Sequence, residues 1–433
     1  MRKRPRRASA KPSRPAAPVE VTVTEVGARG DGLANLDDRP LYVPLTLAGE
    51  RVRVRPGEAR GDGRVAVLDA VLTPAAERVE APCPHFGTCG GCQLQHMAPA
   101  ALAAWKRDLV AQALGRRGLT DVPVAETVSI APGSRRRATF ALAGSGRGLT
   151  LGFNARASHR VVAIDTCLLP EPALWALVEP LRSLLVSLPT PGKGGDVTVT
   201  LTDSGADVVI DLAADPDLAG RERLAAFAAD HDLARLSLRV AGASPEVAAE
   251  RRLPQVRLGD ALVPLPAGGF LQPSRAGEAA LVSRVLEAVA TAPAGPVADL
   301  FGGIGTFALP LHASGRAVHV VEGARPAVGA VAGLARAGLT AEARDLFDKP
   351  LVGKELKRFA AVVFDPPRAG AAAQAAALAE DGPGVVVAVS CAPATFARDA
   401  RLLVDGGYRM ESVVPVDQFP WSAHVEVVAV FRR

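Results

Sequence analysis

Cys391 lies at the end of an apolar run in the stretch VVVAVSCAPAT, two residues before Pro393. The run Val385–Val389 has the composition of a buried strand, so we expect the thiol to stand where that strand ends. A thiol is a covalent nucleophile, and the carboxylate of Glu426, in the later stretch HVEVV, is a base. A lone cysteine is more often a small core residue, and the rest of the sequence has to decide between the two roles.

Acidic residues end three further apolar runs, and a glycine-rich turn precedes them. The stretch VADLFGGIGTFAL runs from a predicted strand, through a turn that contains Gly303, into a predicted helix. Glycines at such a turn let a ligand approach the backbone closely. The next three runs end at Glu322, Asp345 and Asp365, and a carboxylate about twenty residues after such a turn suits the hydroxyl groups of a ribose. Three acidic residues suit an adenosine ligand with a positive centre better than a dinucleotide pyrophosphate.

The segment that must position these residues, 261–433, alternates apolar strand patterns with helical patterns. This order predicts an α/β fold with a doubly wound, mostly parallel sheet. The stretches YRMESVVPVDQF and HVEVVAVFRR predict a terminal antiparallel pair of strands. Ligands of such sheets bind beyond the carboxyl ends of the strands, so the acidic residues and Cys391 are expected to meet at one edge.

Five short stretches of this segment resemble the uracil-C5 RNA methyltransferase family, which belongs to the class I S-adenosylmethionine methyltransferases. The chain has FLQPS where the family has FxQxN, DLFGGIGTF where it has DLFCGxGNF, DPPRAG where it has DPPRxG, SCAPAT where it has SCNPxT, and HVE before the C-terminus, as the family does. The stretches follow the family's order. The resemblance implies a class I methyltransferase domain and an S-adenosylmethionine-dependent RNA (uracil-5-)-methyltransferase.

The resemblance also implies a role for each matching residue. Cys391 would add to C6 of uracil as the covalent nucleophile, and Glu426 would remove the proton from C5 as the base. Phe270 would stack on the flipped target base, with core packing as the alternative. Because a free thiol is mostly protonated near neutral pH, the site has to lower its pKa or deprotonate it on attack, and the sequence leaves both open. The positions implied to bind the cofactor are Gln272, Phe301, Gly303, Thr306, Glu322, Asp345 and Asp365.

The chain departs from the family pattern at four positions. Thr306 and Ser274 stand where the family has Asn, and Gly302 stands where it has Cys. The first two keep a hydroxyl group and glycine favours close approach of the backbone, so we expect cofactor binding to survive. Ala392 replaces the Asn that follows the nucleophile. If that Asn reads the uracil edge, its absence lowers the rate or changes the substrate.

The other four cysteines are expected to bind a metal. Cys83, Cys89 and Cys92 lie in CPHFGTCGGCQLQH, and Cys167 lies in IDTCLLP. Zinc and iron–sulfur clusters both accept four cysteines, so the spacing alone leaves the metal open. The same uracil-C5 family has a [4Fe–4S] site with this spacing, and the resemblance therefore implies that cluster. Because methyl transfer moves no electrons, we expect a structural or RNA-positioning role.

The chain is expected to have four parts. Residues 1–18 contain seven Arg and Lys and no acidic residue, which predicts a disordered basic arm that touches nucleic acid, with a solubilising tail as the alternative. Residues 19–77 alternate with period two between Gly/Asp turns and predict a small OB-like β-barrel that resembles the RNA-binding TRAM domain. Residues 78–260 mix strand and helix patterns and predict a central α+β domain with the four-cysteine site. Residues 261–433 are the predicted methyltransferase domain.

The absence of targeting and membrane-spanning patterns predicts a cytoplasmic protein with no membrane contact, and we expect a monomer with no obligate protein partner. No apolar run of the 433 residues approaches the ~18 that span a bilayer, and no signal peptide pattern is present. Outside the arm the net charge is −2, so the basic excess is confined to the arm.

Several target classes stay open. The expected partner is a structured RNA whose loop uridine can be flipped out. The combination of barrel and cluster resembles the branch that modifies 23S rRNA, and uridine 54 of tRNA is the nearest alternative. Two other classes are an amino-methyltransferase, because DPPR resembles the DPPY of those enzymes, and a non-catalytic RNA-binding assembly factor, which the change at Ala392 suggests.

Overall fold

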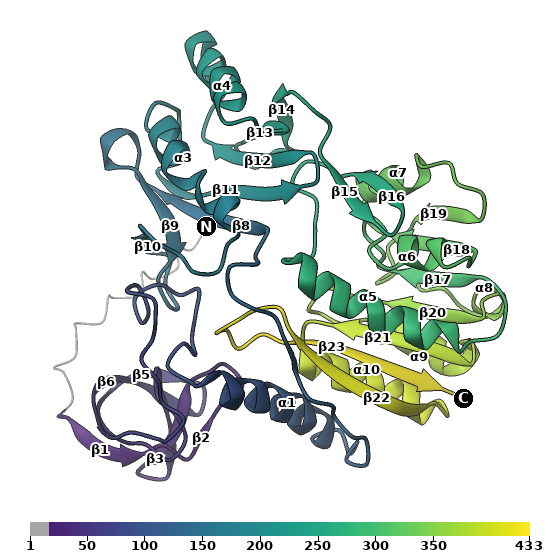
Figure 1. Ribbon diagram of the computed structural model, residues 1–433. Coiled ribbons are helices and arrows are strands. Elements are labelled where there is room, and N and C mark those ends of the chain that lie inside the picture. The colour runs from purple at the N-terminus through teal and green to yellow at the C-terminus, as the bar shows by residue number, and fades with distance from the viewer. Residues whose placement is uncertain (1–16) are drawn as a thin grey trace, which may run out of the picture. The chain divides into compact units, whose positions relative to one another are not determined.

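The computed structural model describes residues 17–433 (Figure 1). The chain divides into two compact units: one contains the chain up to Pro82 together with Gln93–Ala101, and the other contains Cys83–Cys92 and Leu102–Arg433. Of the predicted basic arm, residues 1–16 lie outside the described part of the chain. Among the described residues, every helix is too short or too polar to cross a bilayer.

The first unit contains a six-stranded sheet whose side chains alternate between core and solvent. In β5 (Arg51–Arg60), Val52 and Val54 are fully buried and the arginines that alternate with them are exposed, as the period of a strand requires. The strands are β1 (Val19–Thr22), β2 (Glu25–Val26), β3 (Gly32–Leu36), β4 (Arg39–Val43), β5 and β6 (Gly63–Thr73), in the order β1-β5-β6-β4-β3-β2. The backbone N–H of Thr24, just before β2, donates to the carbonyl of Leu33 in β3 at 2.7 Å and extends the pairing of these two strands.

The second unit contains a mostly antiparallel sheet of seven strands with its own core. The strands are β8 (Arg137–Ala143), β9 (Thr150–Asn154), β10 (Val161–Ala163), β11 (Lys193–Thr202), β12 (Gly205–Leu212), β13 (Arg235–Val240) and β14 (Glu246–Glu250), in the order β10-β9-β8-β11-β12-β13-β14. Only β12 and β13 pair in parallel. The helices α2 (Pro172–Trp175), α3 (Val178–Leu185) and α4 (Leu218–Asp230) and the short 3-10 helix Gly146–Gly148 belong to this region. The hairpin of β15 (Gln255–Leu258) and β16 (Ala261–Pro264) follows it.

The eight-stranded sheet of the second unit has the predicted doubly wound α/β architecture. Its strands are β17 (Val297–Leu300), β18 (Val318–Glu322), β19 (Leu339–Ala343), β20 (Ala361–Phe364), β21 (Val385–Ser390), β22 (Arg409–Asp417), β23 (Glu426–Arg432) and β7 (Val128–Ser129). The order is β19-β18-β17-β20-β21-β23-β22-β7, and the first five strands are parallel. β23 is antiparallel to both β21 and β22, as the C-terminal pattern predicts.

Helices cover both faces of this sheet (Figure 1). One face carries α5 (Arg275–Ala290), α6 (Ala308–Ala313) and α7 (Arg325–Ala332), and the other carries α1 (Pro99–Gly115), α9 (Ala372–Asp381) and α10 (Pro393–Asp405), while α8 (Lys354–Lys357) is a single turn beside α9. Val110 and Leu114 of α1 belong to the core of the C-terminal sheet, and β7 pairs with β22 at its edge. A segment that precedes the seven-stranded sheet in the chain therefore helps to build the C-terminal sheet.

Candidate active site

A cavity of about 660 Å³ lies at the carboxyl ends of the parallel strands. β17 lies between β18 and β20, so the chain leaves β17 at the point where the strand order reverses, and a crevice opens there. Nine of the residues predicted for the site line this cavity: Phe270, Phe301, Gly303, Thr306, Glu322, Asp345, Asp365, Cys391 and Glu426.

The turn after β17 brings the backbone to the cavity. Gly303 has a φ of +54°, and a Cβ added there would meet nothing within 4 Å, so this glycine serves the backbone conformation rather than packing. Phe301 has a φ of +58°, which is uncommon for a side chain of this size. Strain of this kind is common at functional sites, and Phe301 lines the cavity.

Glu322, at the end of β18, is held by two backbone N–H groups. Gly303 donates to its Oε2 at 3.0 Å, and Ala324 donates to its Oε1 at 2.7 Å. Each carboxylate oxygen can accept a second hydrogen bond. The side chain is therefore fixed at the cavity wall and can still accept bonds from ligand hydroxyl groups.

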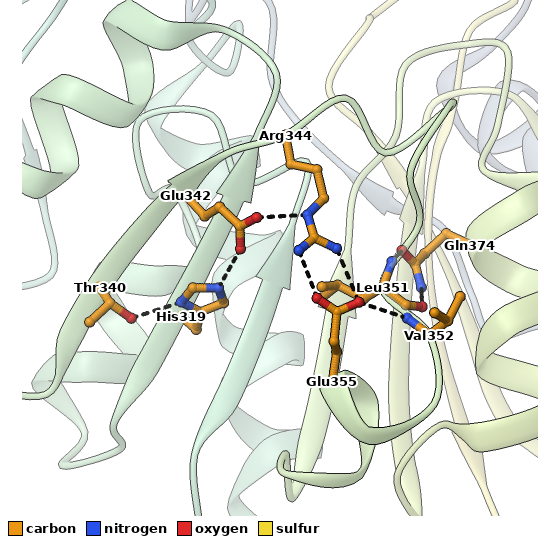
Figure 2. A network of polar contacts seen from close by, with 8 residues as sticks. All are labelled: His319, Thr340, Glu342, Arg344, Leu351, Val352, Glu355 and Gln374. Atoms are coloured by element: carbon orange, nitrogen blue, oxygen red, sulfur yellow. Dashed lines mark hydrogen bonds and ion pairs between the residues drawn. The ribbon is translucent and has the colours of Figure 1, made fainter.

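A charged network beside β19 fixes the start of the next loop (Figure 2). Arg344 donates to Glu342 at 2.7 Å and makes two bonds to Glu355, at 2.7 and 3.2 Å. The bonds from Arg344 hold the pKa of the Glu355 carboxyl below its ordinary value. His319 of β18 contacts Glu342 at 3.3 Å, and burial lowers the pKa of the His319 imidazole.

Gln374 of α9 fixes the other end of this loop. Its fully buried amide accepts from the N–H of Leu351 at 2.9 Å and donates to the carbonyl of the same residue at 3.1 Å. Between the two anchors, Asp345 accepts from the N–H of Phe347 at 2.9 Å. Phe347 lines the cavity with its ring centroid 5.4 Å from that of Phe301, so the loop presents an acid and an aromatic ring together.

Cys391 follows the last residue of β21 and lines the cavity, so it is not a core thiol. Burial raises the pKa of the thiol to about 11, the negative charges of Glu426 and Asp365 act in the same direction, and Arg368 opposes them. Burial, reinforced by these two carboxylates, thus keeps the thiol protonated near neutral pH. Of the two possibilities that the sequence leaves open, the arrangement favours deprotonation on attack.

Glu426, the first residue of β23, has a side chain that is almost completely buried. Burial raises its pKa, and so does the nearby carboxylate of Asp365, while a hydrogen bond from Gln418 and the charge of Arg368 lower it. Burial also raises the pKa of Asp365. A carboxyl with a raised pKa is a stronger base when it is ionised, as proton abstraction from carbon requires.

Gln272 is buried behind the cavity rather than exposed on its wall. Its Nε2 lies 3.5 Å from Oδ2 of Asp365, and its Oε1 accepts from Nε2 of Gln418 at 2.7 Å. The residues that form the cavity wall in the described chain do not include it. Its predicted contact with the cofactor stays a prediction.

Phe270 is 64% exposed although it is a large apolar side chain. It lies in the loop 266–270, which forms one wall of the cavity. Core packing therefore does not account for this residue, and its ring is free to stack on a ligand.

Two of the positions where the family has Asn are helix N-caps here. Ser274 precedes α5, and its Oγ accepts from the N–H of Gly277 at 3.0 Å. Ala392 precedes α10 and has no side-chain cap. Neither residue belongs to the cavity wall in the described chain, whereas Thr306 does. Ala392 thus leaves the first turn of α10 without a side-chain cap.

Packing favours glycine at position 302, which the sequence alone does not reveal. A Cβ at this position would come within 2.8 Å of Val320 and 2.9 Å of Asp299. The sequence predicts that glycine in place of Cys matters little, but in this chain a side chain at 302 would displace its neighbours.

Several residues of the site were not predicted. Arg368 and Phe347 line the cavity. Both follow a predicted acidic residue at a strand end, and this position in the sequence could have identified them. Gln418 lies in the stretch VDQFP, where nothing in the local pattern points to the cavity. Lys106 of α1 pairs with Asp417 at 2.5 Å, and a fully buried lysine cannot be expected from a helical pattern.

The four remaining cysteines lie in two neighbouring segments. His85 contacts Asp165 at 2.6 Å, which joins the segment of Cys83, Cys89 and Cys92 to that of Cys167. Burial raises the pKa of Cys89 and of Cys167, and Cys83 raises both further.

The structure does not, however, preform the predicted metal site. No group of three or more His, Cys, Asp or Glu side chains within residues 17–433 is arranged to hold a metal ion. All five cysteines are thiols of intermediate exposure. Ionised thiols repel one another, so bringing them together is not favourable without a cation. The four predicted ligands therefore lie in neighbouring segments without forming a metal site.

Comparisons with known proteins agree on one family. Residues 263–433 match the family described as tRNA (Uracil-5-)-methyltransferase. An RNA methyltransferase of Brucella melitensis is 43% identical over 96% of this chain and 98% of its own length. The 23S rRNA (uracil(1939)-C(5))-methyltransferase of Halomonas elongata is 34% identical over 96% of this chain and 89% of its own length.

A solved structure shows the same fold. The tRNA (uracil-54, C5)-methyltransferase of Pyrococcus abyssi, in complex with S-adenosyl-L-homocysteine, superposes with a TM-score of 0.74 and covers 95% of this chain and 99% of its own. Its sequence identity is 21%, so this likeness concerns the fold.

Proposed function

Because the chain belongs to the S-adenosylmethionine-dependent RNA (uracil-5-)-methyltransferases, we propose that it methylates C5 of a uridine in 23S rRNA through a covalent Cys391–uracil adduct, with Glu426 as the base. The observation that carries this proposal is the shared cavity. A thiol, a buried carboxylate and an exposed aromatic ring, Phe270, line the same wall as the acidic strand ends.

The chemistry needs both Cys391 and Glu426, because C5 of uracil is too electron-poor to attack a methyl donor. Sγ of Cys391 adds to C6 and loses its proton to solvent, and the electron pair of the C5–C6 double bond moves to C5. After C5 has gained the methyl group, Glu426 takes the C5 proton. The C5–C6 double bond then forms again, the bond between carbon and sulfur breaks, and Cys391 leaves as a thiolate.

The cofactor would bind along the acidic strand ends. When bound there, S-adenosylmethionine supplies the methyl group. Glu322 can accept hydrogen bonds from ribose hydroxyl groups, and Asp345 and Phe347 offer a polar edge and a ring to the adenosine. The open space over Gly303 lets the ligand approach the backbone. Asp365 places a negative charge near the positive centre.

The mechanism is tested with RNA that contains 5-fluorouridine, whose C5 substituent the base cannot remove. The wild-type protein should form an adduct that survives a denaturing gel, and Cys391→Ala should form none while it binds cofactor with unchanged affinity. Glu426→Gln should form a methylated adduct on ordinary RNA and release it slowly. Full turnover by Cys391→Ala would contradict the covalent mechanism.

The same trapped adduct separates this function from the other classes. An amino-methyltransferase needs no cysteine nucleophile, and a non-catalytic assembly factor would transfer no methyl group to RNA that lacks the modification.

The choice of 23S rRNA rests on the Halomonas relative and on the two N-terminal features, the six-stranded sheet of the first unit and the four cysteines. Uridine 54 of tRNA remains the alternative, because the Pyrococcus enzyme with that specificity has the same fold. Mass spectrometric mapping of 5-methyluridine in both RNAs from a deletion strain decides between them. Loss from tRNA alone would overturn the rRNA assignment.

The cysteines support a [4Fe–4S] cluster in a structural or RNA-positioning role. Four thiols of intermediate exposure in adjacent segments suit a cluster ligated by four cysteines. Protein purified without oxygen should contain four irons and four sulfides per chain, and Cys167→Ala should lose both. Stoichiometric zinc without iron would replace the cluster with a zinc site.

The sheet of the first unit supports a TRAM-like RNA-binding role. It is small and has exposed arginines on β5, Arg51, Arg53 and Arg55. An RNA footprint that persists after Cys391→Ala and disappears without residues 19–77 would support this role.

A further inference from the structure

Gln418 lies between the end of β22 and the start of β23 and is only 2% exposed. Its Nε2 donates to Oε1 of Gln272 at 2.7 Å and to Oε1 of Glu426 at 3.2 Å. An amide nitrogen has two hydrogens, so both are used. Neither the sequence nor the family pattern assigns a role to this side chain.

The direction of these hydrogen bonds is fixed by their surroundings. Gln272 points its own Nε2 towards Oδ2 of Asp365, so its carbonyl oxygen faces Gln418. If the Gln418 amide were turned over, its oxygen would face two other oxygens, Oε1 of Gln272 and Oε1 of Glu426. In the observed orientation Oε1 of Gln418 is buried and has no hydrogen-bond partner within the described chain, a cost that the two donated bonds offset.

The backbone on both sides of Gln418 is held by Lys106 of α1. The ammonium of Lys106 pairs with Asp417 at 2.5 Å and donates to the carbonyl of Phe419 at 3.0 Å. The N–H of Phe419 in turn donates to Asp417 at 3.0 Å. Gly277 closes the remaining side, because a Cβ added there would lie 2.4 Å from Oε1 of Gln418. The amide therefore has one position.

From this geometry we propose that Gln418 is a positioning residue for the base: it occupies Oε1 of Glu426 and leaves Oε2 to take the proton from C5. The inference rests on the proposed function, because it assigns an atom to the step given to Glu426. It also links the two buried carboxylates through the two amides, in the order Asp365, Gln272, Gln418, Glu426, and each carboxylate accepts from the amide beside it.

The bond from Gln418 also influences the charge of the base. The charged or titratable groups that act on Glu426 are Asp365, which raises its pKa, and Arg368, which lowers it, and Glu426 in turn raises the pKa of Cys391. Burial is the largest cause of the raised pKa of Glu426, and the hydrogen bond from Gln418 opposes it. Without that donor, Glu426 keeps its proton to a higher pH and fewer molecules have an ionised base at neutral pH.

Gln418→Met keeps the length of the side chain and removes the donor, and it is the main test. We expect kcat for methyl transfer near neutral pH to fall about 10- to 100-fold, as for the loss of one hydrogen bond to a charged group. The acid limb of the pH–rate profile should move to higher pH, and a methylated covalent adduct should accumulate because elimination is slowed. KM for RNA and the affinity for S-adenosylhomocysteine should stay within about twofold.

Gln418→Glu is the second variant, because it has the same shape and keeps the position filled if the methionine does not pack. It adds a third carboxyl beside Glu426 and Asp365 and should move the acid limb further in the same direction. Gln112→Met, an exposed exchange on α1, is the matched control and should behave like wild type. Thermal unfolding checks that each variant is folded.

The outcomes separate the two proposals. If the wild-type protein traps 5-fluorouridine RNA but both Gln418 variants keep its kcat and pH profile, the positioning role is wrong and the covalent mechanism stands. If the wild-type protein traps no RNA, the proposed function fails first. A fall in kcat without any change in the pH profile would assign Gln418 a purely structural role and would also overturn the inference.

Discussion

At the scale of single residues, the site combines groups that would each be unfavourable alone. Cys391, Asp365 and Glu426 share one cavity, and burial raises the pKa of each. Bringing three acids together disfavours ionisation of all of them, which a positively charged methyl donor would relieve. The arrangement therefore suits a ligand with a positive centre.

Phe270 offers a direct test of base stacking. Replacing it with alanine should lower kcat/KM for RNA by a factor that corresponds to about 1–3 kcal/mol, the usual worth of one stacked base. Because its side chain is 64% exposed, thermal stability and cofactor affinity should hardly change. Leu262→Ala, at an exposed leucine of β16 off the cavity wall, is the control. A variant that unfolds far more easily, with intact RNA kinetics, would assign Phe270 to packing instead.

The burial of Asp299 predicts that the free energy of unfolding depends on pH. It is completely buried at the end of β17, and burial raises its pKa from the usual 3.8 to about 8, with further increases from Asp365 and Glu322. The folded protein thus keeps a proton that the unfolded chain releases above pH 4. Its contribution to stability is full below that pH and is lost as the pH rises towards about 8.

Asp299→Asn removes this titration. In the wild-type protein the free energy of unfolding should fall between pH 5 and pH 8, and this one group accounts for up to about 1.4 kcal/mol per pH unit. The variant should show a flatter profile in urea denaturation, whereas Asp230→Asn, at an exposed residue of α4, should keep the wild-type slope. Equal slopes in all three proteins would mean that Asp299 is ionised in the fold.

At the scale of elements, helix α10 explains the most conspicuous departure from the family pattern. Ala392 occupies the N-cap of α10 with an extended backbone, φ −138° and ψ 97°, and no side-chain oxygen to accept from the first turn. Asn is among the best N-cap residues. An Asn at this N-cap would accept from an N–H of the first turn, a bond that Ala392 cannot make.

Restoring the cap gives a prediction with two separate measurements. Ala392→Asn should raise the free energy of unfolding by about 1 kcal/mol, within the range known for N-caps, and should leave the choice of uridine unchanged. Ala392→Ser should do nearly the same, because a hydroxyl group also caps. If Asn raises the rate of methylation strongly while Ser does not, the position reads the uracil edge after all.

At the scale of the whole molecule, the sequence predicts which residues meet because their strands are neighbours in the sheet. It misses the contacts between segments that lie far apart in the chain. The acidic residues and Cys391 follow strand ends, so a parallel sheet was enough to bring them together. The contact between Lys106 and the carbonyl of Phe419 joins residues 313 positions apart, and that between Gln418 and Gln272 joins residues 146 apart. No periodic pattern encodes such pairs, because they depend on how segments far apart in the chain pack together.

The charges of the first unit limit what its sheet can contribute to RNA binding. Its exposed arginines mostly pair with carboxylates of the same sheet: Arg53 with Glu20 at 3.1 Å and Arg55 with Asp69 at 2.7 Å. Paired guanidinium groups attract phosphate less strongly than free ones. Shape rather than net charge would then give this sheet its RNA contacts, and the long-range attraction has to come from another part of the chain.

The excess of basic residues lies in residues 1–18. Deleting this segment should weaken RNA binding without lowering the rate of methyl transfer. The full chain has a net charge of +5, and without the seven Arg and Lys of the arm it has −2. For each phosphate that the shortened protein no longer neutralises, the slope of log K against log salt should decrease by about 0.7–0.9. We therefore expect lower affinity and a shallower salt dependence, with kcat at saturating RNA unchanged. An arm of the same length with every Arg and Lys replaced by Gln should match the deletion; unchanged affinity in both, with lower solubility, would make the arm a solubilising tail.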